Sequence, residues 1–199
     1  MGKSESKKLE DKIWLTRKCR INASERLLRK AVYIESLNVW YSTCIIIMSL
    51  ISYIRKNNDL SLLSLILSIG LIVSIVYVNA TGLRDRSFAL KQNYIDLQLL
   101  LLELESDTDT KHVHIKKKYG ELLKSSENHL PIDMYHVKMR SADLRSEIYW
   151  GGWFAIIWHF VWTILLKCIL IVLPVCLFLI FALKGDLHES ISTFLSSLL

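Results

Sequence analysis

Three stretches of the chain lack nearly all charged residues and are long enough to cross a bilayer. Residues 37–54 and 60–80 contain no Lys, Arg, Asp or Glu, and residues 164–183 contain a single lysine. The segments 1–36 and 81–149, by contrast, hold 21 of the 25 Lys and Arg residues. A transmembrane helix needs about 17–25 apolar residues. The segregation therefore predicts a membrane protein with three spans rather than one soluble domain.

The first polar segment has the spacing of helices. Residues 8–21 interleave basic and apolar positions, which predicts a basic amphipathic helix. Asn22, followed three residues later by Glu25, is typical of a capping box, so a new helix is predicted to begin there. No breaker occurs before Ile54, and that second helix is predicted to continue into the first span.

The second span is predicted to begin at Asp59 as N-cap and has no stop signal at its far end. Its helix is therefore predicted to continue into the segment 81–149. There the apolar residues form two sets with heptad-like spacing, typical of a helical bundle or an oligomer core. The first set is Phe88, Ile95, Leu99 and Leu102, and the second is Leu90, Tyr94, Leu97, Leu101 and Leu104.

The last third of the chain combines an aromatic-rich approach, a span and a tail. Aromatic residues recur at helical spacing over 150–162, ahead of the span 164–183, which Pro174 is predicted to kink. The tail opens with Asp186-x-x-Glu189 and places its apolar residues on one face. This pattern predicts a separate interfacial helix.

These elements define the predicted fold class, an all-α membrane protein. It consists of a two-helix transmembrane hairpin with long cytosolic helical extensions and a third, C-terminal transmembrane helix. The predicted organisation is 1–36 basic amphipathic helices, 37–80 hairpin, 81–149 cytosolic helical bundle, 150–184 aromatic-rich third span and 185–199 amphipathic tail.

The distribution of charge predicts the orientation. Segment 1–36 has ten basic and five acidic residues, and basic flanks stay on the cytoplasmic side. The N-terminus and 81–149 are thus predicted to be cytoplasmic, with the tail outside. Trp40, Tyr41 and Tyr77 are predicted at one membrane interface and Tyr53 at the other. Binding of nucleic acid or a nucleotide by the basic arm is only weakly supported, because it has few aromatic rings beyond Trp14.

Catalytic motifs are absent from the sequence: there is no P-loop, Rossmann fingerprint, nucleophile elbow or HExxH. We therefore predict neither enzyme activity nor a cofactor. The four cysteines show no CxxC spacing, which favours reduced, buried thiols. His112 and His114 lie near Asp107 and Asp109, but a polar surface loop explains these four residues more simply than a metal site.

His129, Asp133 and His136 form a second polar cluster, spaced as on a helix around Pro131. Proline suits the first turn of a helix, so a helix is predicted to begin at this residue. The cluster fits either a cytosolic regulatory site or a helix cap with packing contacts.

Polar residues inside the spans are the remaining candidates. Ser61, Ser64 and Ser68 share a helical face in the second span, and Gly70 and Ser74 form a small-xxx-small pair. Small residues permit close helix packing, and a serine face could instead line a water-filled path in an oligomer. The remaining intramembrane polar candidates are Lys167, which can snorkel to the inner surface, and His159, which lies at the edge of the third span.

One further set of residues is typical of a known family. It comprises KIWLTRKCRINASERL at 12–27, Leu97-Gln98, Tyr119, Glu127-Asn128-His129 and Ile132-Asp133. With two spans behind the first segment, the chain resembles the SLATT family (SMODS and SLOG-associating two-transmembrane effector domain). It is most similar to the subgroup often encoded beside reverse transcriptases. The resemblance implies a role in bacterial defence against phage, at the inner membrane, but no site residues.

The resulting functional hypothesis is a homo-oligomeric effector that forms a pore or disrupts the inner membrane when a cytosolic partner or nucleotide signal activates it. A single three-span protomer cannot enclose a channel, so an oligomer is expected. The alternative is a non-conducting membrane anchor that tethers a reverse transcriptase or a nucleotide-signalling enzyme. The expected partners are the lipid bilayer, further copies of the chain and one of these enzymes.

Overall fold

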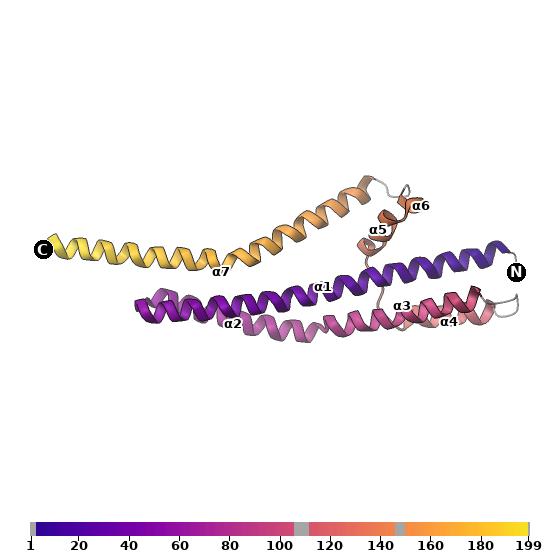
Figure 1. Cartoon of the computed structure of the whole chain (residues 1–199), viewed down its shortest axis with the longest axis horizontal. Helices are drawn as coiled ribbons and strands as arrows, with labels where there is room; N and C mark the ends of the chain where they lie inside the picture. Colours follow the sequence, from indigo (N-terminus) through magenta and orange to yellow (C-terminus); the bar gives the residue numbers. More distant parts are fainter. Residues whose placement is uncertain (1–2, 106–111, 146–149, 199) are drawn as a thin grey trace. The chain divides into compact units, whose positions relative to one another are not determined.

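A computed structural model describes residues 3–105, 112–145 and 150–198, and these residues form helices and connecting turns only. In chain order, the helices are α1 (Lys3–Arg55), α2 (Asn58–Thr81), α3 (Leu83–Glu105), α4 (His112–Lys124), α5 (Pro131–Arg140), α6 (Ala142–Arg145) and α7 (Trp150–Leu198) (Figure 1). Three helical stretches are long and apolar enough to cross a membrane. They lie within Glu5–Arg55, within Asn58–Glu105 (α2 with α3) and within Trp150–Leu183. The all-α class with three spans is thus confirmed.

The helices form two compact units. We call Met1–Ala31 with Gly82–His159 the polar unit, and Val32–Thr81 with Phe160–Leu199 the apolar unit. Both α1 and α7 contribute residues to each unit.

Helix α1 is continuous through Asn22, so the predicted helix boundary at that residue is wrong. The Asn22 side chain does not cap a helix; its Nδ2 donates to the backbone oxygen of Asp133 over 3.1 Å. The capping-box pattern was present in the sequence, but N-capping requires a residue with non-helical backbone. A partner distant in sequence uses the Asn22 amide instead.

Asn57 is the N-cap of α2, so the prediction of Asp59 as the N-cap is wrong. The Asn57 Oδ1 accepts from the Leu60 N–H over 3.0 Å, which is the N-cap to N3 bond. The Ser52 hydroxyl donates to the Asn57 backbone oxygen over 2.7 Å and ties the end of α1 to the start of α2. Asn57, not Asp59, therefore starts the second helix of the hairpin.

Helix α2 ends at Thr81, which corrects the prediction of an uninterrupted helix into the polar segment. Gly82 has φ +54°, a left-handed conformation that favours glycine because it has no Cβ. Helix α3 begins at the next residue, and the Arg86 N–H donates back to the Gly82 oxygen over 2.9 Å. One glycine thus separates the apolar helix from the polar one.

The core of the polar unit is built mainly on one face of α3. Leu9 and Ile13 of α1 and Ile115 of α4 pack against this face, and Trp14, Tyr119 and Leu122 lie at the edge of the cluster. The residues that α3 contributes are Leu97, Leu100, Leu101 and Leu104. Of the two predicted heptad sets, only the second contributes buried leucines; Phe88, Ile95, Leu99 and Leu102 are exposed.

The core of the apolar unit lies where the hairpin meets α7. Cys44 and Met48 of α1 and Leu60 and Leu63 of α2 are buried together. The side chains that pack against them are Ile51, Leu67, Leu177, Phe178 and Phe181. The third apolar helix therefore packs on the hairpin.

Helix α7 runs without interruption from Trp150 to Leu198. The tail does not begin a separate helix at Asp186, as was predicted from its capping pattern, because the backbone is already helical there. The side chains of residues 184–199 lie outside the description, so the predicted apolar face of the tail stays a prediction.

Candidate functional site

The serines of α2 do not share one environment. Ser64 is 6% exposed and buried beside the hairpin core, and its hydroxyl donates to the Ser61 backbone oxygen over 2.8 Å. Ser68 is less buried and donates to the Leu65 oxygen over 2.7 Å, and Ser61 is exposed. Ser64 is thus a packing residue, Ser61 is exposed, and Ser68 is half-buried.

The small residues Gly70 and Ser74 of α2 also lie in different environments. Ser74 faces α1, and its hydroxyl donates to Oδ1 of Asn38 over 3.0 Å. A Cβ added at Gly70 would meet nothing within 4 Å. Ser74 therefore joins the two helices of the hairpin, as expected for polar contacts between membrane helices. Gly70 makes no close helix approach within the chain.

A feature that the sequence did not reveal lies at Pro174, which is fully buried in α7. Proline has no N–H, so the carbonyl of Leu170, four residues earlier, loses its helical donor. The Tyr41 hydroxyl of α1 donates to that oxygen over 3.0 Å, and the Trp40 Nε1–H donates to the next carbonyl, Ile171, over 3.0 Å. Neighbouring helices must satisfy such carbonyls in a membrane. The two rings, predicted at a membrane interface, thus have polar partners in the protein.

Lys167 is exposed on α7 and lies beside Tyr33 of α1. Its Nζ lies 5.0 Å from the centre of the Tyr33 ring, a cation–π distance. The Tyr33 hydroxyl also donates to the Lys167 backbone oxygen over 3.2 Å. Since Tyr33 precedes the predicted span of α1, the contact places Lys167 level with the end of that span. Snorkelling of Lys167 to the inner membrane surface stays a prediction.

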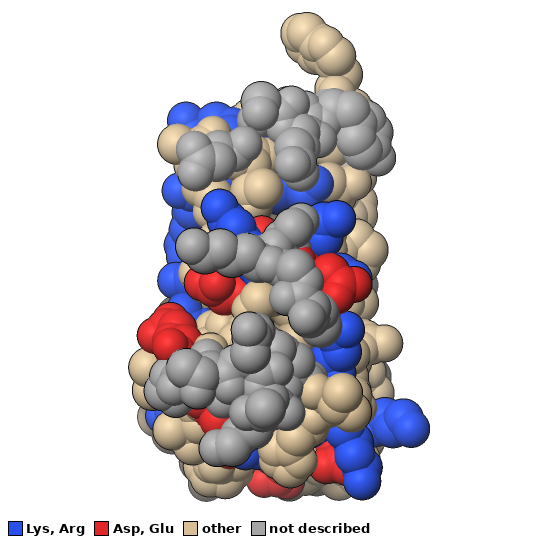
Figure 2. Space-filling model, turned by 90° about the vertical axis from the view of Figure 1, so that its right-hand side faces the viewer, with Lys and Arg blue, Asp and Glu red and all other residues tan. Residues whose placement is uncertain are grey.

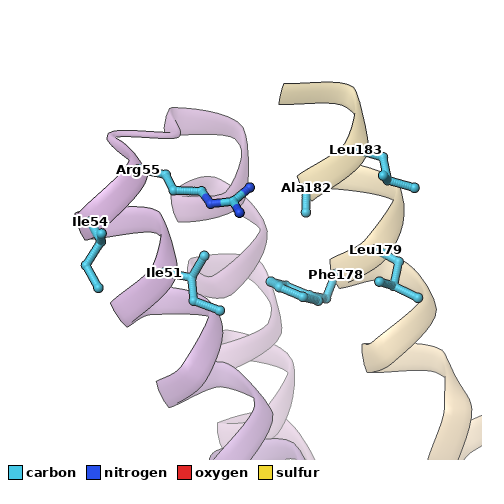
Figure 3. Close-up of a pocket in the computed structure, with 7 residues that line it drawn as sticks. All are labelled: Ile51, Ile54, Arg55, Phe178, Leu179, Ala182 and Leu183. Carbon is cyan, nitrogen blue, oxygen red and sulfur yellow. The ribbon is translucent and has the colours of Figure 1, made fainter. Parts of the chain in front are cut away.

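The apolar unit also contains a cavity between α1 and α7, of about 300 Å³. Figure 3 shows Arg55 of α1 and Phe178 of α7 directed toward the space between the helices. The lining residues are Ile51, Ile54, Arg55, Phe178, Leu179, Ala182 and Leu183. Hydrocarbon with a single guanidinium suits a lipid chain better than a polar substrate.

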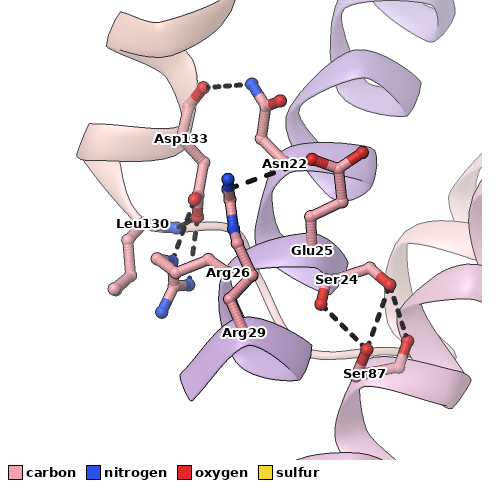
Figure 4. A network of polar contacts seen from close by, with 8 residues as sticks. All are labelled: Asn22, Ser24, Glu25, Arg26, Arg29, Ser87, Leu130 and Asp133. Carbon is pink, nitrogen blue, oxygen red and sulfur yellow. Dashed lines mark hydrogen bonds and ion pairs between the residues drawn. The ribbon is translucent and has the colours of Figure 1, made fainter. Parts of the chain in front are cut away.

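In the polar unit, Asp133 is the centre of a hydrogen-bond network between α1 and α5 (Figure 4). Asp133 is 1% exposed, and its carboxylate accepts two bonds from Arg26, over 2.9 and 3.1 Å. It also accepts the Leu130 N–H over 2.9 Å, which fixes the first turn of α5 behind Pro131. The predicted cluster residue Asp133 is therefore a capping and packing group.

The two histidines of the predicted cluster lie near this carboxylate. Burial lowers the pKa of His129 below 6.5, with Asp133 opposing and Arg20 reinforcing the effect. Burial also lowers the pKa of His136; Arg140, His159 and Arg29 reinforce the effect, and Asp133 opposes it. His159 is exposed and belongs to the polar unit, not to the apolar one. The structure therefore brings His159 toward His136, a grouping that sequence spacing did not indicate.

Arg20 is a second buried polar residue that the sequence did not single out. Arg20 is 1% exposed, and its guanidinium donates to Oδ1 of Asn93. It also donates to the backbone oxygen of Leu122 over 2.9 Å and to that of Leu123 over 3.3 Å. Those two oxygens belong to the last turn of α4, where the helix dipole favours a cation. Burial lowers the pKa of Arg20, opposed by Tyr119. Arg20 thus caps α4 from α1.

Helices α1 and α3 are joined by paired serines. The Ser24 hydroxyl donates to the Ser87 backbone oxygen over 2.9 Å, and the Ser87 hydroxyl donates to the Ser24 oxygen over 2.8 Å (Figure 4). Both serines are buried. Small side chains that bond reciprocally let these helices approach closely.

The described residues contain no metal site, and the four cysteines differ in exposure. Among the described residues no three His, Cys, Asp or Glu side chains are placed to hold a metal ion; Asp107 and Asp109 lie outside them, as does the His112 side chain. Burial, and to a lesser extent Asp133, raises the pKa of Cys19 to about 11, which keeps this thiol protonated. Cys19 and Cys44 are buried, but Cys168 and Cys176 are exposed, contrary to a wholly buried set.

Basic and acidic side chains are interspersed with uncharged ones on the face shown in Figure 2. Trp14, the aromatic residue of the basic arm, packs against the polar-unit core, and the Lys18 Nζ lies 5.7 Å from its ring centre. One ring packed in this way offers little surface for stacking on a base.

Three apolar helices, a packed polar unit and charged networks outside the spans define the class: a multi-pass helical membrane protein. The chain belongs to SMODS and SLOG-associating 2TM effector domain family 5, whose model matches residues 2–180. This match confirms the SLATT resemblance, and its range reaches through most of the third apolar helix. No curated protein and no solved structure matches the chain.

Proposed function

We propose that this chain is an effector that permeabilises the bacterial inner membrane when several copies assemble. The observation that carries the proposal is the serine stripe of α2, with Ser61 exposed and Ser68 half-buried, in a chain of an effector family. An exposed serine on an apolar helix gains little from contact with hydrocarbon. It becomes useful when copies associate and water enters between them.

The hydrogen bond of Ser68 is compatible with both a lipid-facing state and a water-facing state. The Ser68 hydroxyl bonds to the Leu65 oxygen of its own helix, so it has a partner even when the face meets lipid. In an assembly the same hydroxyl can turn to water, and the Leu65 oxygen still has its helical N–H. The polar face therefore costs little at rest and lines a path once copies gather.

In this proposal the N-terminus and residues 81–149 lie in the cytoplasm, as the basic flanks favour. Lys167, beside Tyr33, then lies at the inner mouth of the path, where a positive charge influences ion selectivity. The polar unit receives the activating signal. The family description names association with SMODS and SLOG. The proposed partner class is a nucleotide-signalling enzyme or a reverse transcriptase.

The first test is ion and dye flux through proteoliposomes that contain the full chain. The second test is the membrane potential of induced cells, followed with a potential-sensitive dye. The candidate partner is co-expressed. Ser61→Leu with Ser68→Leu closes the path and is expected to reduce flux at least tenfold. Ile66→Leu with Val73→Leu, two exposed positions elsewhere on α2, is the matched control and leaves flux unchanged. Ser64 is unsuitable for this test, because a leucine there would disturb the buried hairpin core.

Two results would count against the proposal. Absence of flux from the unaltered chain, with its partner present, would favour the non-conducting anchor, particularly if the partner still copurifies with the membrane. Equal flux from the serine variant and the control would remove Ser61 and Ser68 from the path.

A further inference from the structure

Helix α3 has an exposed apolar face with the spacing of a coiled coil. Phe88, Ile95, Leu99 and Leu102 are 67%, 38%, 57% and 49% exposed. With Gln92, which is also exposed, they follow one another at alternating steps of four and three residues. We call these five residues the α3 seam. In heptad terms Phe88, Ile95 and Leu102 take d positions, and Gln92 and Leu99 take a positions.

The α3 seam is separate from the core of the chain. The buried leucines Leu90, Leu97 and Leu104 occupy the f positions of the same heptads, on the opposite side of α3. A helix that is apolar on two opposite sides buries one against its own chain and has a second for a partner. The α3 seam also lies beyond Gly82, so it belongs to the polar unit rather than to the apolar span.

The flanking charges indicate which partner fits. In a parallel coiled coil, a g residue lies beside the e residue five positions later on the neighbouring helix. Lys91 is the g residue and Asp96 is the e residue of the next heptad. A second copy of α3, parallel and in register, would therefore place each Lys91 beside Asp96 of its neighbour. An unrelated helix would need the same pattern to match.

The membrane supplies the orientation that this pairing needs. Copies inserted in one bilayer share one topology, so α3 follows the same span on the same side of the membrane in every copy. Confinement also raises their effective concentration, which helps a seam of only about two heptads. Gln92 at an a position favours the aligned register, because its amide then meets the same amide of the next copy.

We infer that the α3 seam is the self-association surface of this chain and forms a parallel coiled coil with α3 of further copies. Leu99 at a with Ile95 at d favours more than two strands, as a pore requires. The inference deepens the proposed function, since it identifies the contact that brings the spans together. It concerns assembly alone and is tested without a flux measurement.

Cysteine cross-linking in native membranes tests the geometry. The full chain with the exposed Cys168 and Cys176 changed to Ala is the background, because Cys19 and Cys44 are buried. Leu99→Cys is expected to form a disulfide-linked dimer upon mild oxidation, because identical a positions meet in a parallel pair. Lys117→Cys, exposed on α4, is the matched control and is expected to stay monomeric.

A charge reversal tests the partner. Lys91→Glu is expected to weaken self-association about twofold to fivefold, and adding Asp96→Lys restores it, because the exchanged pair is again opposite in sign. For these charge variants, the readout is the fraction of Leu99→Cys chains that cross-link in native membranes. Ile95→Glu with Leu99→Glu should yield monomers of unchanged helicity, because both side chains are exposed in the single chain.

The outcomes separate this inference from the proposed function. The parallel seam would be overturned if Leu99→Cys failed to cross-link. It would also be overturned if cross-links formed only between a copy carrying Phe88→Cys and a copy carrying Leu102→Cys, because that pairing is antiparallel. Oligomers that persist in the double-Glu variant would do the same. A chain that cross-links at Leu99→Cys but never conducts would keep the seam and refute the effector proposal.

Discussion

At the residue scale, the carboxylate of Asp133 connects the N-terminal helix to a segment more than a hundred residues later. It is nearly inaccessible to water and accepts bonds from Arg26 and from the first turn of α5. A carboxylate removed from water is stable only when such donors surround it. Asp133 and Arg26 therefore have more influence on stability than any exposed ion pair described in the chain.

Asp133→Ala is expected to destabilise the polar unit by about 3 kcal/mol, since Arg26 and the Leu130 N–H lose their acceptor. Hydrogen–deuterium exchange of the full chain in detergent should show the loss of protection in α5. The control is Glu103→Gln, which weakens the exposed pair with Lys118 and should cost about 1 kcal/mol or less. Equal losses in the two variants would contradict the central role of Asp133.

Acidification is expected to destabilise the polar unit. The pKa of His129 and that of His136 are lowered by folding, so the unfolded chain binds protons first as the pH falls. The stability from the two neutral imidazoles is complete above pH 6.5 and is lost as the pH falls through 6.5 toward the folded-state values. Urea unfolding at pH 7.5 and 5.5 measures the difference.

His129→Gln with His136→Gln should flatten this pH dependence, and His114→Gln, at an exposed position on α4, should not. A dependence that survives in the double variant would assign the effect to other groups.

At the element scale, α7 lacks one helical hydrogen bond, and a side chain of α1 supplies the missing donor. Pro174 leaves the Leu170 carbonyl without its helical donor, and Tyr41 provides one. The sequence predicted Pro174 as a kink and Tyr41 as an interfacial ring, but not their relation. Hydropathy predicts which residues lie within the bilayer, but it does not predict which helices pack together.

A double-mutant cycle measures this relation. Tyr41→Phe is expected to cost about 1 kcal/mol in the natural chain, and much less after Pro174→Ala, because the restored amide then donates to the Leu170 carbonyl. Unfolding of the full chain in mixed micelles provides the free energies. Tyr77→Phe, on the exposed side of α2, should be neutral in both backgrounds. Additive effects of the two substitutions would exclude the proposed repair.

At the scale of the whole molecule, the pattern of charge and hydropathy was enough for the fold class and for the number of spans. It failed where a local signal competed with distant contacts. Asn22 resembled an N-cap, but its side chain bonds to Asp133. The apolar periodicity predicted one continuous helix through Gly82, but the helix ends there. The candidate Asp133 was found by spacing, whereas its partner Arg26 and the capping residue Arg20 required the third dimension.

The predicted orientation yields a direct labelling experiment. Asn58→Cys, at the start of α2, should react with a membrane-impermeant maleimide in intact cells, and Lys117→Cys should react only after lysis. The background again has Cys168 and Cys176 changed to Ala. A reporter fused after Leu199 should lie outside the cytoplasm if α7 crosses the bilayer. Labelling of Lys117→Cys in intact cells would reverse the orientation.

The two bonds from Trp40 and Tyr41 to adjacent carbonyls of α7 restrict how the apolar unit can move. A slip of α7 by one residue shifts it by about 1.5 Å and turns it by about 100°, which would separate both donors from their acceptors at once. Sliding and rolling of α7 against α1 are thus blocked together. Rearrangements of the apolar unit that keep these bonds move its segments of α1 and α7 together.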